Sequence, residues 1–138
     1  MKKTGNKIKK TGIVITIPKT VKWSEYQKEL DAVEDWNQVM NFKVSNTPKK
    51  LEIGSRVYLC YNGNIIGWQT FVGTYHGEFT CTTTDKEWKG CFIQRSGPFH
   101  YLKTPIPCAG FRGFKYINYS IIENQNTPNI EKNKKNNN

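Results

Sequence analysis

The stretch that decides the fold spans residues 51–75 and reads LEIGSRVYLCYNGNIIGWQTFVGTY. Hydrophobic residues alternate with others over Arg56–Tyr61, a pattern that predicts a strand. Asn62-Gly63 comes next, and this pair favours the two-residue turn of a β-hairpin. A return strand is predicted from Ile65 to about Tyr75, with bends at its glycines. The stretch therefore predicts an antiparallel hairpin in the middle of the chain.

One helix and further strands are predicted around this hairpin. Alternating apolar residues predict a strand over Ile13–Ile17, which Pro18 ends. A helix is predicted from about Ser24 to Asn37, because apolar residues recur there at helical intervals and Ser24 and Gln27 have capping-box spacing. The remaining strands are predicted over Met40–Val44, Phe79–Thr83, Cys91–Gln94 and Phe114–Ile122.

This order of elements indicates the fold class. A strand, one helix and then several strands with glycine bends predict an α+β, mainly β protein. We expect a small, partly closed barrel of five to seven mostly antiparallel strands, with one main helix near the N-terminus.

The charge distribution separates the ends of the chain from its body. The net charge is +10, and the first ten residues contain five lysines and no acid. Residues 124–138 are rich in Lys and Asn. We therefore expect a disordered basic N-terminus over residues 1–10, one folded domain over 11–123, and a disordered tail over 124–138.

Residues 51–67 (LEIGSRVYLCYNGNIIG) resemble a signature of PUA-like domains, which include the ASCH and EVE groups. In that signature a Gly-Ser-Arg-Val strand leads through a tight turn to a return strand ending in Ile-Ile-Gly. The resemblance implies a PUA-like pseudobarrel whose cleft, between helix and barrel, binds RNA, modified bases or nucleotides. Some ASCH proteins are amidohydrolases that use a Lys, a Thr and a Glu. Lys19, Thr20 and Glu78 are residues of those types, but no catalytic role is carried over to them.

The C-terminal half contains a stretch without acids. Residues 88–122 hold five cations and no carboxylate, which predicts one positive face that attracts phosphates. At its centre, Arg95 can bind a phosphate or a guanine edge bidentately, and Gly97-Pro98 predicts a loop. Phe99 can stack on a base, and Ser96 and His100 can form hydrogen bonds. The five cations are Lys89, Arg95, Lys103, Arg112 and Lys115.

The tryptophans divide into two predicted groups. Trp36 and Trp68 fit core positions, whereas Trp23 at the helix entrance and Trp88 beside two lysines fit the wall of a cleft. Asn41 can supply edge hydrogen bonds to an unstacked base. The complete predicted binding site comprises Trp23, Asn41, Trp88, Lys89, Arg95, Ser96, Phe99, His100 and Arg112.

These features favour a module that binds a nucleic acid or a nucleotide, through a modified or unstacked base. Two alternatives stay open: an amidohydrolase acting on a modified nucleoside, and a small phage or mobile-element protein that inhibits a host protein. A binding protein is favoured over an enzyme, because no Walker-type loop, G-x-S-x-G or H-E-x-x-H motif occurs.

The cysteines and the hydropathy indicate the compartment. The four cysteines form no C-x-x-C pair and follow no secretory signal, so we expect buried thiols and neither a metal nor a cofactor. No apolar run approaches the roughly 18 residues of a membrane span. We expect a cytoplasmic monomer of bacterial or phage type.

Overall fold

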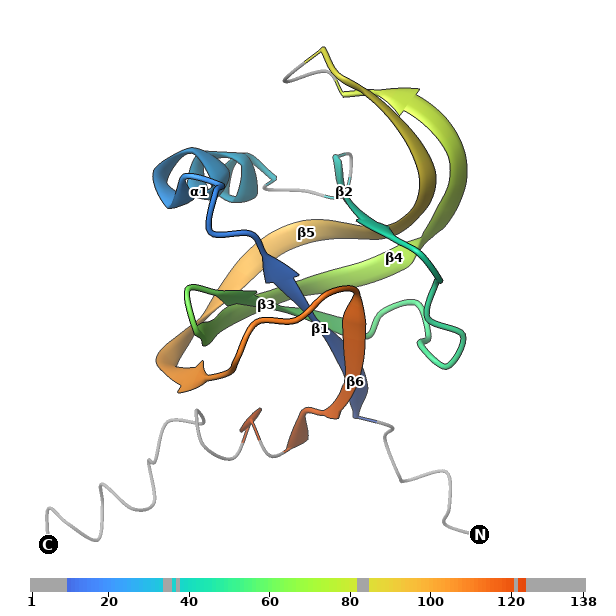
Figure 1. Ribbon diagram of the computed structural model, residues 1–138. Helices are drawn as coiled ribbons and strands as arrows, with labels where there is room; N and C mark the ends of the chain where they lie inside the picture. Colours follow the sequence, from blue (N-terminus) through green and yellow to red (C-terminus); the bar gives the residue numbers. More distant parts are fainter. Residues whose placement is uncertain (1–9, 34–35, 37, 82–84, 121, 124–138) are drawn as a thin grey trace, which may run out of the picture.

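The computed structural model describes residues 10–33, 36, 38–81, 85–120 and 122–123 (Figure 1). Its elements are β1 (Thr11–Ile17), α1 (Trp23–Ala32), β2 (Val39–Val44), β3 (Arg56–Tyr61), β4 (Asn64–Thr80), β5 (Glu87–Pro107) and β6 (Phe114–Asn118). The two ends predicted to be disordered lie outside the described residues, apart from Lys10, which pairs with Glu123.

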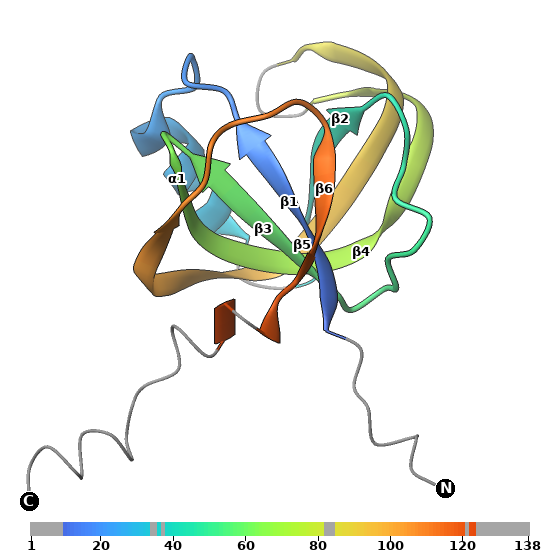
Figure 2. The same cartoon turned by 60° about the horizontal axis from the view of Figure 1, so that its bottom comes forward.

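The six strands form one sheet in the order β2-β5-β4-β3-β1-β6. Only the β1–β3 pair is parallel; the other four pairs are antiparallel. The mainly β class, the number of strands and the single helix near the N-terminus are thus confirmed. The sheet curls strongly around its core (Figure 2), but it does not close into a barrel, because β2 and β6 remain its two edges.

The central hairpin is present as predicted. Asn62 and Gly63 have φ values of 52° and 84°, and Tyr61 pairs with Asn64 across the turn. Two consecutive positive φ values define the type I′ turn, which matches the twist of the adjoining strands. Asparagine and glycine adopt this backbone at little cost.

The prediction of a loop at Gly97-Pro98 is wrong, because β5 continues through these residues. Ser96 pairs with Thr70 and His100 pairs with Trp68, so three residues of β5 stand opposite Gln69 alone. The glycine and proline therefore form a bulge within a long strand, which is a regular position for both residue types. β4 is also longer than predicted: it includes the start of the separate strand expected over 79–83, whose last two residues lie outside the described ranges.

The helix is shorter than predicted, and its predicted capping box is absent. Lys22 is the N-cap and makes no side-chain capping bond, so Ser24 lies inside the helix. The helix ends at Ala32, because the backbone of Val33 leaves the helical region with φ −86° and ψ 81°. Of the residues predicted to continue it, 34, 35 and 37 lie outside the described part of the chain.

The middle of the sheet is buried on both faces. On one face, the odd-numbered isoleucines of β1 pack with Leu30 of α1 and with Phe71 and Ile93. On the other face, Val14, Tyr58 and Cys60 pack under the segment that follows β5. Two covered faces explain why β1 and β3 are almost continuously apolar. Within the described ranges, no helix has both the length and the apolar character needed to cross a membrane.

Candidate functional site around Arg95

Arg95 lies inside the protein, on the face of the sheet that α1 covers. It pairs with Met40 of β2 and Phe71 of β4, and only 1% of its surface is exposed. Its Nη2 donates a hydrogen bond to the hydroxyl of Tyr26, in α1, at 2.9 Å. Arg95 thus lies against the helix, where a cleft was expected, but it is no part of an exposed positive face, because its guanidinium is held between helix and sheet.

The positive charge of Arg95 has no counter-charge within the described residues. Its Nε and Nη1 are buried without a hydrogen-bond partner there. The ion pairs of these residues join Lys10 and Arg56 to Glu123, and Lys89 to Glu78; none involves Arg95. A buried and unpaired cation costs several kcal/mol. The site thus carries three N–H groups without an acceptor among the described residues.

A second buried polar side chain lies beside Arg95. Gln69 is fully buried and is two residues from Phe71, the β4 partner of Arg95. Its Nε2 donates to the carbonyl of Gly97 at 2.9 Å, and its Oε1 lacks a partner among the described residues. Diagonal neighbours on paired strands are about 7–8 Å apart at the backbone. The site therefore combines unsatisfied donors with one unsatisfied acceptor.

The connection between α1 and β2 lies against the same part of β5. The Ser96 hydroxyl donates to the carbonyl of Gln38. A Cβ on Gly97 would stand 2.6 Å from the ring of Trp36, so only glycine leaves room for this contact. Trp36 was predicted as a core residue, but 58% of it is exposed. It presents an aromatic ring next to the site.

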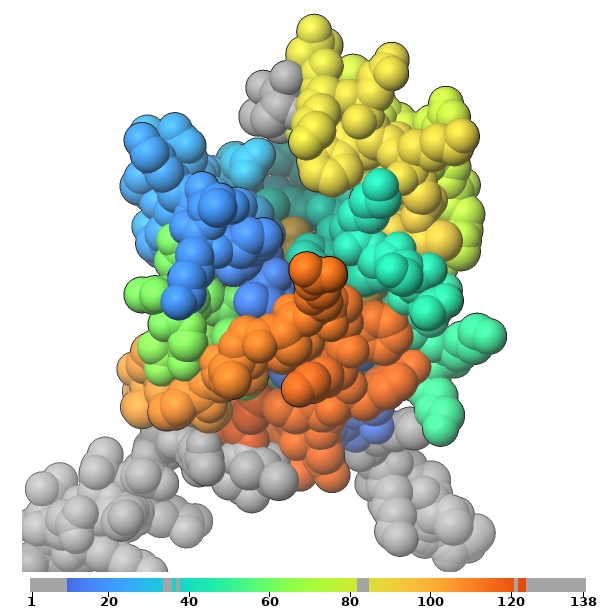
Figure 3. Space-filling model, in the orientation of Figure 1, coloured from blue at the N-terminus to red at the C-terminus, as the bar shows by residue number. Residues whose placement is uncertain are grey.

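Aromatic residues of α1, β3 and β5 pack together on the face of the sheet that α1 covers. Trp23 lies 6.0 Å from Tyr26 and 5.1 Å from Tyr61 between ring centroids. Phe99 packs on the same core, and its ring contacts Tyr101 edge to face. Figure 3 shows a hollow between the α1 segment (blue), β2 (teal) and the far ends of β4 and β5 (yellow). Arg95 contacts α1 and pairs with β2, two of the elements that border this hollow.

The structure brings together some of the predicted site residues. Arg95, Ser96, Phe99 and Trp23 lie in or beside the space between α1 and β5. The hydroxyl of Ser96 is already bonded to the Gln38 carbonyl, so Ser96 positions the connection to β2.

Five other predicted residues lie elsewhere. Asn41 accepts a hydrogen bond from Gln94. Both residues are next in sequence to the paired residues Met40 and Arg95, so they lie on the opposite face of the sheet from the site. Lys89 is 81% exposed and pairs with Glu78 at 3.6 Å. Trp88 contacts Lys86 and Phe92. Arg112 is exposed in the segment between β5 and β6. The fifth residue is His100.

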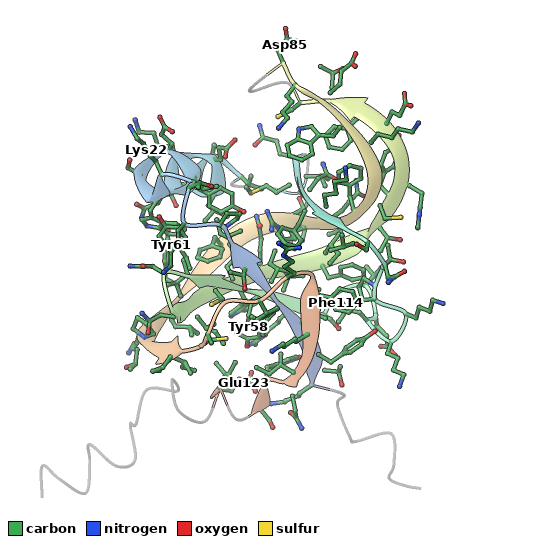
Figure 4. All side chains as sticks on the ribbon, viewed as in Figure 1. Lys22, Tyr58, Tyr61, Asp85, Phe114 and Glu123 are labelled. Atoms are coloured by element: carbon green, nitrogen blue, oxygen red, sulfur yellow. The ribbon has the colours of Figure 1, made fainter. Side chains whose placement is uncertain are left out.

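His100 belongs to a different cluster, on the opposite face of the sheet. Its ring stacks on Trp68 at 4.0 Å, and the guanidinium of Arg56 covers Trp68 at 4.1 Å. Trp68, predicted as core, packs against the core of this face and is half-buried between these two groups. In Figure 4, Tyr58 and Glu123, which bond Arg56, lie far from α1, whereas Tyr61 lies beside it.

We expect His100 to make stability depend on pH. Burial and the nearby Arg56 charge lower the pKa of His100 from its ordinary value of 6.5. The pKa of His100 is lower in the folded protein than in the unfolded chain. The stability that neutral His100 contributes is therefore present above pH 6.5 and is lost as the pH falls through the pKa of the folded state. Urea unfolding of the wild type and of His100→Gln, from about pH 7.5 to about pH 5, measures this. An equal loss in both proteins would contradict it, and His76→Gln is the matched control.

Tyr26 and Gln69 are the site residues that the sequence prediction omitted. Gln69 could have been found, because Gly67, Gln69 and Phe71 are the alternate, buried residues of this part of β4, a pattern that places an amide inside. No local signal marks Tyr26, since its hydroxyl meets Arg95 across 69 residues of sequence.

The cysteines and acids offer no stronger site. All four cysteines are free, and no group of three metal-ligating side chains occurs in the described ranges. Burial and the neighbouring Cys108 raise the pKa of the Cys60 thiol to about 11. Sγ of Cys91 lies 3.1 Å from Nδ1 of His76, a contact that the spacing of these residues in the sequence did not predict. Glu78, of the type used by amidohydrolases, is bound to Lys89.

No protein-family model, curated protein or solved structure matches this chain.

Proposed function

We propose that this protein binds a nucleotide or a nucleic acid, with Arg95 as the anchor beneath α1. The observation that carries the proposal is the buried guanidinium, whose Nε and Nη1 meet no acceptor in the described residues. A ligand oxygen or ring nitrogen with high electron density supplies what Arg95 lacks. Arginine binds phosphates and guanine edges through the N–H groups of its guanidinium, and Nε and Nη1 are donors left for such a ligand.

Three further features support a nucleotide over a simple anion. Trp36 offers an exposed aromatic ring beside Gly97, and stacking on an aromatic ring favours a base by about 1–3 kcal/mol. The hairpin resembles that of PUA-like domains, a resemblance that implies a nucleotide-binding cleft between helix and barrel, and a hollow borders α1 here. The strongly basic chain attracts polyanions in general. The free thiols support a reducing, cytoplasmic location as part of the same proposal.

The test is to purify the protein under native conditions and to identify what it releases on denaturation. We expect an elevated ratio of absorbance at 260 nm to that at 280 nm, and a nucleotide or oligonucleotide in the mass spectrum. Arg95→Met should lose the bound species, because the guanidinium anchors it. Lys103→Met, which removes an exposed cation from the same strand, should retain it. Equal occupancy of wild type and Arg95→Met would exclude Arg95 as the anchor.

A further inference from the structure

The site contains an unused acceptor as well as unused donors. Oε1 of Gln69 is buried and has no partner within the described part of the chain. The same is true of Nε and Nη1 of Arg95. A ligand that offers only acceptors would satisfy Arg95 and leave Gln69 unsatisfied. A buried polar group without a partner weakens binding. The ligand that fits both residues therefore presents a donor next to an acceptor.

The orientation of the Gln69 amide is determined by the fold. Its Nε2 donates to the carbonyl of Gly97, which accepts but cannot donate. Rotating the amide by half a turn would place Oε1 against that carbonyl oxygen, and the two oxygens repel each other. The bulge at 97–99, which stands opposite Gln69, sets the position of the carbonyl. Oε1 is thus held as an acceptor.

We propose that Gln69 makes the site selective for the edge of a nucleobase, so that the base enters beneath α1 and the phosphate stays outside. This rests on the proposed nucleotide binding. Each nucleobase carries an N–H donor beside an oxygen or nitrogen acceptor: Arg95 takes the acceptor and Gln69 takes the N–H. A fully deprotonated phosphate has acceptors only, and it would bring one of its oxygens against Oε1.

Calorimetric titration at about pH 8, where phosphate monoesters carry both charges, separates these cases. The probes are the four ribonucleoside 5′-monophosphates, their nucleosides and ribose 5-phosphate. We expect the tightest nucleotide to bind about tenfold or more tightly than ribose 5-phosphate. The corresponding nucleoside should keep most of that affinity. Because this series uses the wild-type protein, it is decisive even if a Gln69 variant fails to fold.

Gln69→Leu should lower the affinity for the tightest-binding nucleotide about tenfold or more and leave the affinity for ribose 5-phosphate unchanged. Gln94→Leu is the matched control, since Gln94 binds Asn41 outside the site. If ribose 5-phosphate binds as tightly as the nucleotide, the phosphate occupies the site. The proposal that Gln69 selects a base is then wrong, whereas the proposal that the protein binds a nucleotide is not. If no nucleotide binds more tightly to the wild type than to Arg95→Met, the proposed function itself is wrong.

Discussion

Arg95→Met is expected to raise the free energy of unfolding by about 1–3 kcal/mol while it removes nucleotide binding. Methionine is apolar and of comparable length, and it fills the space between Met40 and Phe71 without a charge. The variant loses only one hydrogen bond, from Nη2 to Tyr26, and it removes two buried nitrogen atoms that have no partner among the described residues. A buried charge that costs the fold stability is typical of a binding site, where function and stability oppose each other.

Urea unfolding at neutral pH measures the stability of the variant without added ligand. We expect a higher midpoint with an unchanged dependence on urea. Destabilisation of Arg95→Met by more than about 1 kcal/mol would mean that the fold compensates the charge, and it would contradict the basis of the site.

Arg56→Met is expected to have the opposite effect, a loss of about 2–3 kcal/mol. The Arg56 guanidinium lies between the rings of Trp68 and Tyr119, at 4.1 and 4.4 Å from their centroids. Its Nη2 contacts Glu123 at 3.0 Å and its Nη1 donates to Tyr58 at 3.0 Å. The Arg56 side chain is 22% exposed, so solvent screens the ion pair in part.

The same unfolding measurement applies to Arg56→Met, and Arg56→Lys separates charge from shape. Lysine keeps the positive charge but cannot lie flat between two rings while binding two partners, so it should recover less than half of the loss. A stability equal to that of the wild type in both variants would show that the cluster on this face contributes little.

Much of the fold could be predicted from short-range sequence patterns. The Asn62-Gly63 turn requires positive φ values that few other residue pairs adopt, and alternation over Arg56–Tyr61 reports the two faces of one strand. Long-range features were missed. Gly97-Pro98 is a turn signal in isolation, but β5 pairs with β4 both before it, at Ser96, and after it, at His100, which makes it a bulge.

The candidate site was predicted only in part, for the same reason. Arg95 and Phe99 were identified by residue type, and the structure places both beneath α1. His100 is adjacent to Phe99 in sequence, yet strand alternation directs it to the other face. Tyr26, the partner of Arg95, comes from a distant segment and no local pattern predicts it, whereas the buried amide of Gln69 could have been predicted from the alternation along β4.

Thermal unfolding of the wild type and Arg95→Met, each with and without saturating ribonucleoside monophosphate, tests the role of Arg95 most directly. We expect a crossover. Without nucleotide the variant should unfold at the higher temperature, and with nucleotide only the wild type should shift upward, because ligand binds its folded state alone. The account is contradicted if no nucleotide shifts the wild type and Arg95→Met unfolds at the lower temperature.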